Sequence, residues 1–200
     1  MLLWISRTHH VIITTSKERG IMETILLAGV HGVGKGFFLE KVKENIKCYS
    51  VYSASNMIER YKLSADAGYK KVNNVNCNQD ILINAIKKER ISNTKNFIID
   101  GHLCIFNADG DVQRIPEYFI INAKITAIVL LQDDPKLIYT RLTQRDSEKI
   151  SIEDLQRMQD EELKYACELQ DKFQIKYRII THKYTGEQFE ELLNNIGRGA

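Results

Sequence analysis

The segment GVHGVGKGFF (Gly29–Phe38) carries the strongest pattern in the chain, and it follows a short apolar run, TILLA (Thr24–Ala28). A glycine, four residues and then Gly-Lys is the pattern of a phosphate-binding loop, in which backbone N–H groups and a lysine surround a polyphosphate. The residue after the lysine is usually Ser or Thr, whose hydroxyl helps to hold Mg²⁺. Gly36 and Phe37 stand there instead. The segment therefore predicts a nucleotide site that lacks one usual metal ligand.

Short apolar runs alternate with helical patterns along the chain. A continuous apolar run is typical of a strand buried on both faces, and strand–helix alternation is typical of a parallel sheet. We therefore predict an α/β fold with about five parallel strands and helices on both faces of the sheet. The predicted strands are Thr24–Ala28, Tyr49–Ser53, Asn96–Asp100, Ile125–Leu131 and Tyr177–Thr181, and the predicted helices begin near Lys35, Asn78, Pro135, Leu155 and Glu187.

The acidic end of the third predicted strand points to the same site as the loop. Ligands of parallel sheets bind beyond the carboxyl ends of the strands. Asp100 ends the apolar run NFIID, so it should lie on the edge that carries the loop after Ala28. A carboxylate in this position can orient Mg²⁺ or its waters, whereas the alternative is an aspartate that only caps a turn with Gly101. The loop favours the metal interpretation.

Two arginines supply a third element of the pattern. Arg141 and Arg145 are four residues apart on the predicted helix after Pro135, so they share one face. Two guanidinium groups on one face suit phosphoryl oxygens in a transition state, although a solvated basic face is the commoner fate of such a pair. We predict Lys35, Asp100, Arg141 and Arg145 as catalytic residues, and Gly29, Val30, His31, Gly32, Val33, Gly34, Lys35, Gly36 and Phe37 as nucleotide-binding residues.

Composition limits the other classes. The 200 residues are 44% hydrophobic and 27% charged, with a net charge of +2, so charge gives no argument for nucleic-acid binding. The apolar start, Met1–Ile5, is too short for a signal sequence or a membrane span. We therefore expect a cytoplasmic protein with small-molecule partners, without membrane or nucleic-acid partners and compatible with a homo-oligomer. Residues 1–21 are predicted as an extension, and residues 22–200 as one domain.

The four cysteines give no metal or redox motif. They are widely spaced and contain no C-x-x-C pair, so neither a zinc ribbon nor a thioredoxin-like site is indicated. We expect all four to be buried, reduced thiols, as is usual in the cytosol.

The order of loop, strand-end acid and R-L-x-x-R resembles that of the P-loop nucleoside monophosphate kinase superfamily. It is most similar to the archaeal-type adenylate kinases and to their relatives described as small ATP-binding proteins of AAA type. The resemblance runs from about Met22 to Leu193, and it implies a P-loop NTPase three-layer sandwich with a mobile lid, ATP as co-substrate, Mg²⁺, and transfer of the γ-phosphoryl group to a nucleoside monophosphate, most simply AMP. The matching segments are GVHGVGKG, DGHLCIFNADGDVQRIP, DDPKLIYTRLTQRD and SIEDLQRMQDEELKYA.

The resemblance also locates the acceptor. The family binds its monophosphate in the segment after the second strand, with an arginine on the phosphate, and Lys70 falls near that place. Lys70 could instead be solvated, and His102 could be satisfied by backbone rather than by substrate. Ser53, Asn56, Lys70 and His102 are the predicted substrate-binding residues.

Two departures from the family keep other functions open. Bacterial-type adenylate kinases also read G-K-G but continue with Thr, where this chain has Phe37, and His31 replaces a loop proline. Mg²⁺ would then be held by phosphate oxygens, by waters and by Asp100. One alternative is a small-molecule or polynucleotide kinase of the same fold that phosphorylates a hydroxyl, with Asp100 as base. The other is a nucleotide-binding regulator with weak ATPase activity.

Overall fold

A central sheet of five parallel strands organises the computed structural model, which describes residues 22–64, 75–107, 109–145 and 150–197. The strand order is β2-β3-β1-β6-β7, and every neighbouring pair is parallel. The predicted α/β fold is therefore confirmed. The strands are β1 (Thr24–Ala28), β2 (Tyr49–Ser53), β3 (Asn96–Asp100), β6 (Ala127–Leu131) and β7 (Lys176–Ile180).

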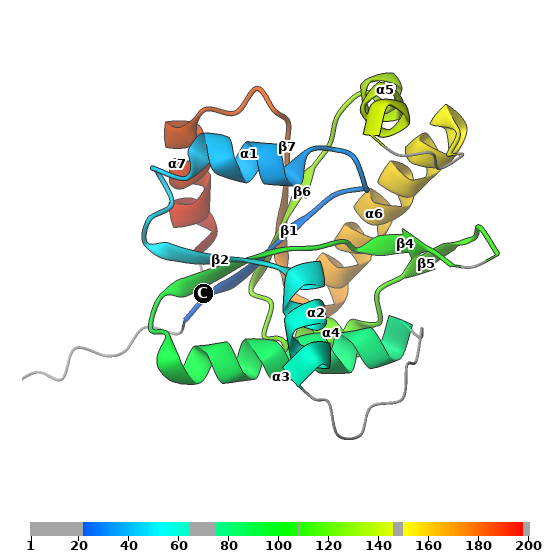
Figure 1. Ribbon diagram of the computed structural model, residues 1–200. Helices are drawn as coiled ribbons and strands as arrows, with labels where there is room; N and C mark the ends of the chain where they lie inside the picture. The colour runs from blue at the N-terminus through cyan, green and yellow to red at the C-terminus, as the bar shows by residue number, and fades with distance from the viewer. Residues whose placement is uncertain (1–21, 65–74, 108, 146–149, 198–200) are drawn as a thin grey trace, which may run out of the picture.

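Helices cover both faces of this sheet, which explains the apolar strand sequences. Every residue of β1 and β6 is buried. Figure 1 shows α1 and α7 on one side of the sheet and α3 and α4 on the other. A short antiparallel hairpin, β4–β5, extends beside α6. The bounds are α1 (Lys35–Val42), α2 (Ala54–Ser64), α3 (Val75–Ser92), α4 (Glu117–Asn122), α5 (Pro135–Arg145), α6 (Ile152–Phe173), α7 (Gly186–Gly197), β4 (Cys104–Phe106) and β5 (Val112–Arg114).

The structure contains two helices that the sequence patterns did not indicate, α2 and α4. The first begins immediately after β2, where the Ser53 hydroxyl accepts a hydrogen bond from the Asn56 N–H at 3.4 Å, an N-cap contact. The second has six residues, too few to show a helical period. The strand β6 also begins at Ala127 rather than Ile125, and β7 lies one residue earlier than predicted.

The prediction of four buried thiols was wrong for two of them. Cys104 is buried and Cys77 is partly buried, but Cys48, in the turn before β2, and Cys167, on the outer face of α6, are exposed. All four are free thiols. No helix in the described ranges has the length and apolarity needed to cross a membrane. The predicted extension, Lys70 and the segment 146–149 that would enter the lid lie outside the described residues.

Strand register brings the predicted site together. In the parallel pairing, Asp100 at the end of β3 lies opposite Leu27 of β1 on one side and Ser53 of β2 on the other. The N–H of Gly101 donates to the Leu27 carbonyl at 3.0 Å, which keeps the two chain segments together past the strand ends. The loop after β1 and the acid at the end of β3 therefore share one edge of the sheet.

The two phenylalanines after the loop have different environments. Phe38 is fully buried and packs edge-to-face on Phe189 of α7, with ring centroids 5.0 Å apart. Phe37 is 72% exposed, and its ring centroid lies 6.1 Å from that of His182. Phe38 thus joins α1 to the core, while Phe37 faces the ligand edge.

Replacement of each phenylalanine by alanine should separate these roles. Phe38→Ala should lower the free energy of unfolding by about 3–5 kcal/mol, because it opens a cavity between α1 and α7. Phe37→Ala should change it by less than about 0.5 kcal/mol, because the ring is largely in solvent. Urea denaturation of both variants measures this, and an equal loss in the two would contradict the assigned environments.

Candidate active site

The phosphate-binding loop depends on glycine at two turns. Gly32 has φ of 78° and Gly34 has φ of 97°, in the left-handed region where other residues are strained. A Cβ atom at Gly32 would lie 2.5 Å from Leu142 Cγ, and one at Gly34 would lie 2.9 Å from His182. The Phe38 N–H donates to the Gly34 carbonyl, so α1 begins directly at the end of the loop. The N-terminal end of α1 therefore faces the cleft, as an anion site requires.

Lys35 lies between the loop and the strand-end acid. Its Nζ donates to the Gly29 carbonyl at 2.7 Å and lies 3.8 Å from Asp100 Oδ1. Burial lowers the pKa of Lys35, and the Asp100 carboxylate opposes this. Burial raises the pKa of Asp100, and the Lys35 ammonium opposes that. Both charges are thus poorly solvated, which strengthens their interaction with any further charge in the cleft.

The first arginine of α5 is fixed against the loop. Arg141 Nη2 donates to Asp133 Oδ2 at 2.6 Å, and Nη1 donates to the Val33 carbonyl at 3.2 Å. His182 Nε2 donates to the same carbonyl at 2.6 Å. Sequence reasoning gave neither Asp133 nor His182 a role. Asp133 follows β6 and His182 follows β7, so both lie at strand ends on the ligand-binding edge of the sheet. This position after a predicted strand is the feature of the sequence that could have indicated them.

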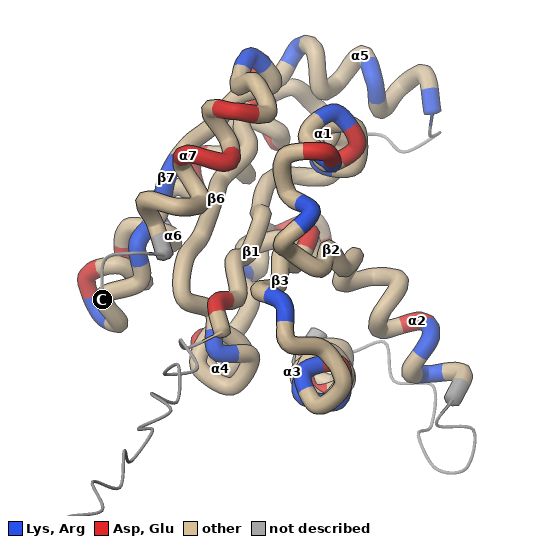
Figure 2. The backbone as a smooth tube through the Cα atoms, turned by 90° about the vertical axis from the view of Figure 1, so that its left-hand side faces the viewer, with Lys and Arg blue, Asp and Glu red and all other residues tan. Residues whose placement is uncertain are grey.

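The second arginine reaches the tip of the loop. Arg145 Nη2 lies 2.6 Å from His31 Nε2, so the guanidinium donates and the imidazole nitrogen accepts. Figure 2 shows basic positions along α5, at the end of the molecule that also carries α1. The structure therefore brings both arginines to the phosphate-binding loop, as predicted.

These side chains surround one cleft of about 450 Å³. Three of the predicted nucleotide-binding residues do not line the cleft. They are Gly29 and the buried residues Val30 and Val33. The predicted residues that line it are His31, Gly32, Gly34, Lys35, Gly36, Phe37, Ser53, Asp100, His102, Arg141 and Arg145.

The predicted substrate-binding residue Asn56 lies outside the cleft. It is exposed in the first turn of α2 and does not line the cleft. Successive residues of a helix point about 100° apart, so Ser55 faces the cleft while Asn56 faces solvent.

His102 is a neutral side chain at the inner wall of the cleft. Burial, followed by the neighbouring Lys35 ammonium, lowers the pKa of His102 to about 3. Its Nδ1 atom is buried and makes no hydrogen bond of normal geometry, although the Gly29 carbonyl is close enough to oppose the pKa shift. His102 therefore adds no positive charge to the site at neutral pH.

A family model described as an AAA domain matches residues 28–159, which is more than half of the chain. The chain belongs to this AAA-domain family. The match includes the loop, Asp100, both arginines and the first part of α6. A comparison with curated proteins found no match.

This AAA domain is also similar to solved structures of low sequence identity. The tunicamycin resistance protein of Deinococcus radiodurans is 13% identical, with a TM-score of 0.56 over 88% of this chain and 95% of that chain. A gluconokinase from Sinorhizobium meliloti 1021 is 15% identical, with a TM-score of 0.48 over 90% of this chain and 94% of that chain. At such identities the likeness concerns the fold alone, which is an α/β fold of P-loop NTPase type.

A buried glutamate lies behind the site of the AAA domain. Glu162 of α6 is 2% exposed, and its Oε1 accepts hydrogen bonds from the N–H groups of Leu103 at 3.0 Å and Cys104 at 3.5 Å. Burial raises the pKa of Glu162 to about 7, against the opposing effects of these N–H groups and of the Lys35 ammonium. In the sequence, Glu162 is indicated only by the interruption that it makes in the apolar stripe of α6. The contact ties α6 to the segment that carries His102.

The cleft offers few protein ligands for Mg²⁺. Asp100 is a carboxylate at the strand end, and Ser53 and Ser55, whose Oγ atoms are 2.9 Å apart, line the same cleft. Within the described ranges, no three His, Cys, Asp or Glu side chains form a metal-binding group. The donors present fit an ion held mainly by nucleotide phosphates and waters and oriented by Asp100, which is the arrangement that Mg²⁺ prefers.

The buried glutamate predicts a pH-dependent stability. Its folded pKa of about 7 lies above the ordinary 4.5, so between these values the folded state holds a proton that the unfolded state has lost. The free energy of unfolding of the parent should therefore fall, relative to that of the Glu162→Gln variant, as the pH rises from about 4.5 to about 7. Above about pH 7, the difference between the two free energies should be constant. Urea denaturation at a series of pH values measures it. Glu153→Gln, exposed on the same helix, is the control, and a pH-independent difference for Glu162→Gln would contradict the burial of an ionisable group.

Proposed function

We propose that the protein is an ATP-dependent phosphotransferase that moves the γ-phosphoryl group of ATP to a small-molecule acceptor. The observation that supports this most directly is the convergence of Lys35, Asp100, Arg141 and Arg145 on one cleft next to a glycine-rich loop. Three cations and a helix N-terminus suit a polyphosphate, and the Asp100 carboxylate, 3.8 Å from Lys35 Nζ, suits the metal or the attacking group.

Each side chain has a distinct task in this proposal. Lys35 donates to the outer phosphates and offsets their charge. Arg141 is held in place by Asp133 and the Val33 carbonyl, so it can contact phosphoryl oxygens with little loss of side-chain freedom. Arg145 contacts His31 at the tip of the loop and lines the cleft. Phosphoryl transfer needs positioning and charge stabilisation, which these groups provide without a covalent intermediate.

Bound Mg²⁺ would neutralise charge on the transferring phosphates. Asp100 would orient it through water, because neither Gly36 nor Phe37 supplies the hydroxyl that usually follows the loop lysine. Ser53 lies beside Asp100 across the β2–β3 pairing and offers the nearest strand-borne hydroxyl on this edge. The site therefore relies on Asp100 more than a loop of the usual pattern would.

Two acceptor classes are proposed. AMP is the acceptor that the resemblance to adenylate kinases implies, and its phosphate would depend on Lys70, which is outside the described residues. A hydroxyl-bearing small molecule is the second class, and Asp100 would take up its proton. A second cavity, of about 180 Å³, adjoins the cleft, and no Lys, Arg, Asp or Glu is among its described lining residues, which supports the second class. The remaining alternative is a regulator that binds nucleotide and transfers no phosphoryl group. Kinetic measurements with and without an acceptor distinguish it from a phosphotransferase.

ATP binding should depend on Lys35. A charge-assisted contact of this kind contributes about 1.5–3 kcal/mol, so Lys35→Ala should weaken ATP binding by about tenfold or more. Calorimetry measures this, with Lys43→Ala as control, since Lys43 is exposed beyond the end of the same helix. Equal ATP affinity in the parent and in a folded Lys35→Ala variant would remove the basis for the proposed nucleotide site.

Arg141 should matter more for turnover than for binding. Its charge is needed most where phosphoryl charge is redistributed, so Arg141→Ala should lower kcat by about a hundredfold or more and change ATP affinity much less. Acceptor-stimulated ADP release measures kcat, and Arg178→Ala on exposed β7 residue Arg178 is the control. A change confined to KM would make Arg141 a binding residue only.

A further inference from the structure

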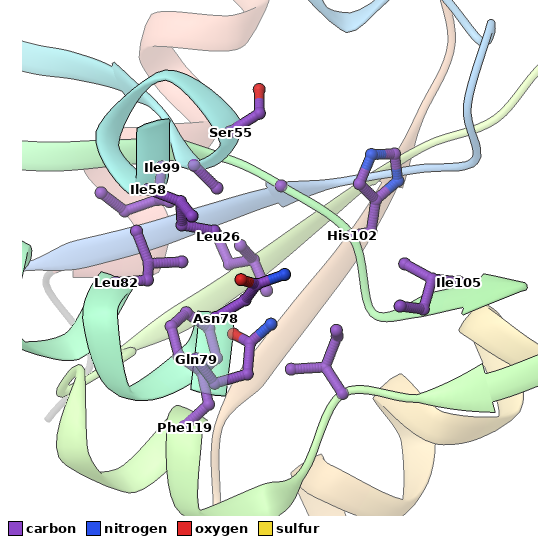
Figure 3. Close-up of a pocket in the computed structure, with 13 residues that line it drawn as sticks. Leu26, Ser55, Ile58, Asn78, Gln79, Leu82, Ile99, His102, Ile105 and Phe119 are labelled. Carbon is purple, nitrogen blue, oxygen red and sulfur yellow. The ribbon is translucent and has the colours of Figure 1, made fainter. Parts of the chain in front are cut away.

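A second cavity of about 180 Å³ adjoins the cleft that Lys35, Arg141 and Arg145 line, here called the phosphate cleft. The cavity lies on the side of this cleft away from the two arginines. It lies between the ends of β1 and β3 and the helices α2, α3 and α4 (Figure 3). Its apolar walls come from Leu26, Ile58, Leu82, Ile99, Ile105, Ile115 and Phe119. Such a concave, mostly apolar space with a few polar groups is typical of a small-molecule site, and its volume suits one small group rather than a whole nucleotide.

The polar groups of this cavity include no carboxylate, ammonium or guanidinium group. They are the Ser55 hydroxyl, the Asn78 and Gln79 amides and the His102 imidazole, and no Lys, Arg, Asp or Glu is among the described lining residues. Figure 3 shows the Asn78 and Gln79 amides among the apolar side chains, and His102 also lines the phosphate cleft.

Two of these polar groups have a buried atom without a hydrogen-bond partner among the described residues. They are Asn78, at Oδ1, and His102, at Nδ1. A buried acceptor without a partner is costly, and a ligand that donates an O–H or N–H to it would remove this cost. The cavity is thus suited to a ligand with hydrogen-bond donors and an uncharged body.

None of the described residues that line both the cavity and the cleft is a Lys, Arg, Asp or Glu. They are Ala54, Ser55, Gly101 and His102, and Asp100 lines the cleft beside them. Of the described cations of the cleft, Lys35 already contacts the Gly29 carbonyl and lies 3.8 Å from Asp100. An acceptor phosphate at the junction would bring its charge close to the Asp100 carboxylate and would meet no further cation among the described lining residues of the cavity, which is unfavourable. A hydroxyl can occupy the same place without that cost.

We propose that this cavity holds the acceptor and that the acceptor is an uncharged alcohol, not a phosphate monoester such as AMP. This inference rests on the proposed phosphotransferase function and names its substrate class. The hydroxyl stands at the junction, next to Asp100 and His102, while the body of the alcohol lies against the apolar walls and donates a hydrogen bond to Asn78. A nucleoside and a simple polyol or sugar share this chemistry.

The chemistry of this step balances without another reactant. The acceptor oxygen forms a bond to the γ-phosphorus of ATP, and the bond from that phosphorus to the β,γ-bridging oxygen breaks, so that ADP leaves. The hydroxyl proton passes to the Asp100 carboxylate and then to solvent. The products are a phosphate monoester, ADP and a proton.

Matched pairs of acceptors test the proposal directly. ADP release by the parent protein is measured with adenosine and AMP, with ribose and ribose 5-phosphate, and with glycerol and glycerol 3-phosphate, and ³¹P NMR identifies each product. At least one uncharged member should raise the rate of ADP release tenfold or more over its phosphorylated partner. The pair that responds distinguishes a nucleoside from a sugar or polyol.

An Asn78→Leu variant tests where the alcohol binds. It keeps the size of the side chain and removes the acceptor atom, so it should raise the acceptor KM by about tenfold and leave ATP affinity, measured by calorimetry, unchanged. Asn84→Leu, at an exposed position of α3, is the control. An unchanged acceptor KM in a folded Asn78→Leu variant would overturn the placement of the alcohol in this cavity.

Two further outcomes distinguish a failure of this inference from a failure of the proposed function. If a phosphorylated member is the one that stimulates and a diphosphate forms, the uncharged-alcohol inference is overturned while the phosphotransferase function stands. If ATP binds and no member of any pair stimulates ADP release, the phosphotransferase function is overturned, and the inference with it.

Discussion

The buried contact of Lys35 Nζ with the Gly29 carbonyl, with the Asp100 carboxylate 3.8 Å away, is the constraint on which the site depends. A lysine held in this way needs a loop that turns back on itself, and left-handed glycines in that loop provide the turn. It also needs the acid on the neighbouring strand end, and the parallel pairing of β1 with β3 provides that. Since both ions are poorly solvated, their charges act strongly on whatever enters the cleft.

The charge distribution around this contact divides the site into two halves. On one side Arg141 and Arg145 join Lys35, and Asp133 and the Val33 carbonyl keep Arg141 directed at the loop. On the other side the walls are neutral or apolar, and Glu162 fixes the backbone after His102 from behind the sheet. A polyphosphate donor and an uncharged acceptor suit these two halves. The AMP acceptor implied by the adenylate kinase resemblance would need a cation that the described acceptor side does not supply.

Local patterns predicted much of this structure, because the loop, the buried strands and the helix after Pro135 depend on neighbouring residues. The contacts that complete the site could not be predicted in this way. Glu162 meets Leu103, and His182 meets Val33, across 59 and 149 residues of sequence. Asn56 lies outside the cleft because α2 begins at Ala54 and leaves that side chain exposed. The uncharged acceptor cavity likewise combines residues of β1, β3 and three helices, and no single segment contains its pattern.

The fate of the γ-phosphoryl group tests the account most directly. The parent protein is incubated with ATP labelled with ³²P in the γ position and a mixture of low-molecular-weight cell metabolites, with the Lys35→Ala variant as blank. The account predicts that label appears in a new organic phosphate ester, distinct from ATP and inorganic phosphate, and that the variant forms none. Label found only in inorganic phosphate, or retained in bound ATP, would contradict phosphoryl transfer to a small-molecule acceptor.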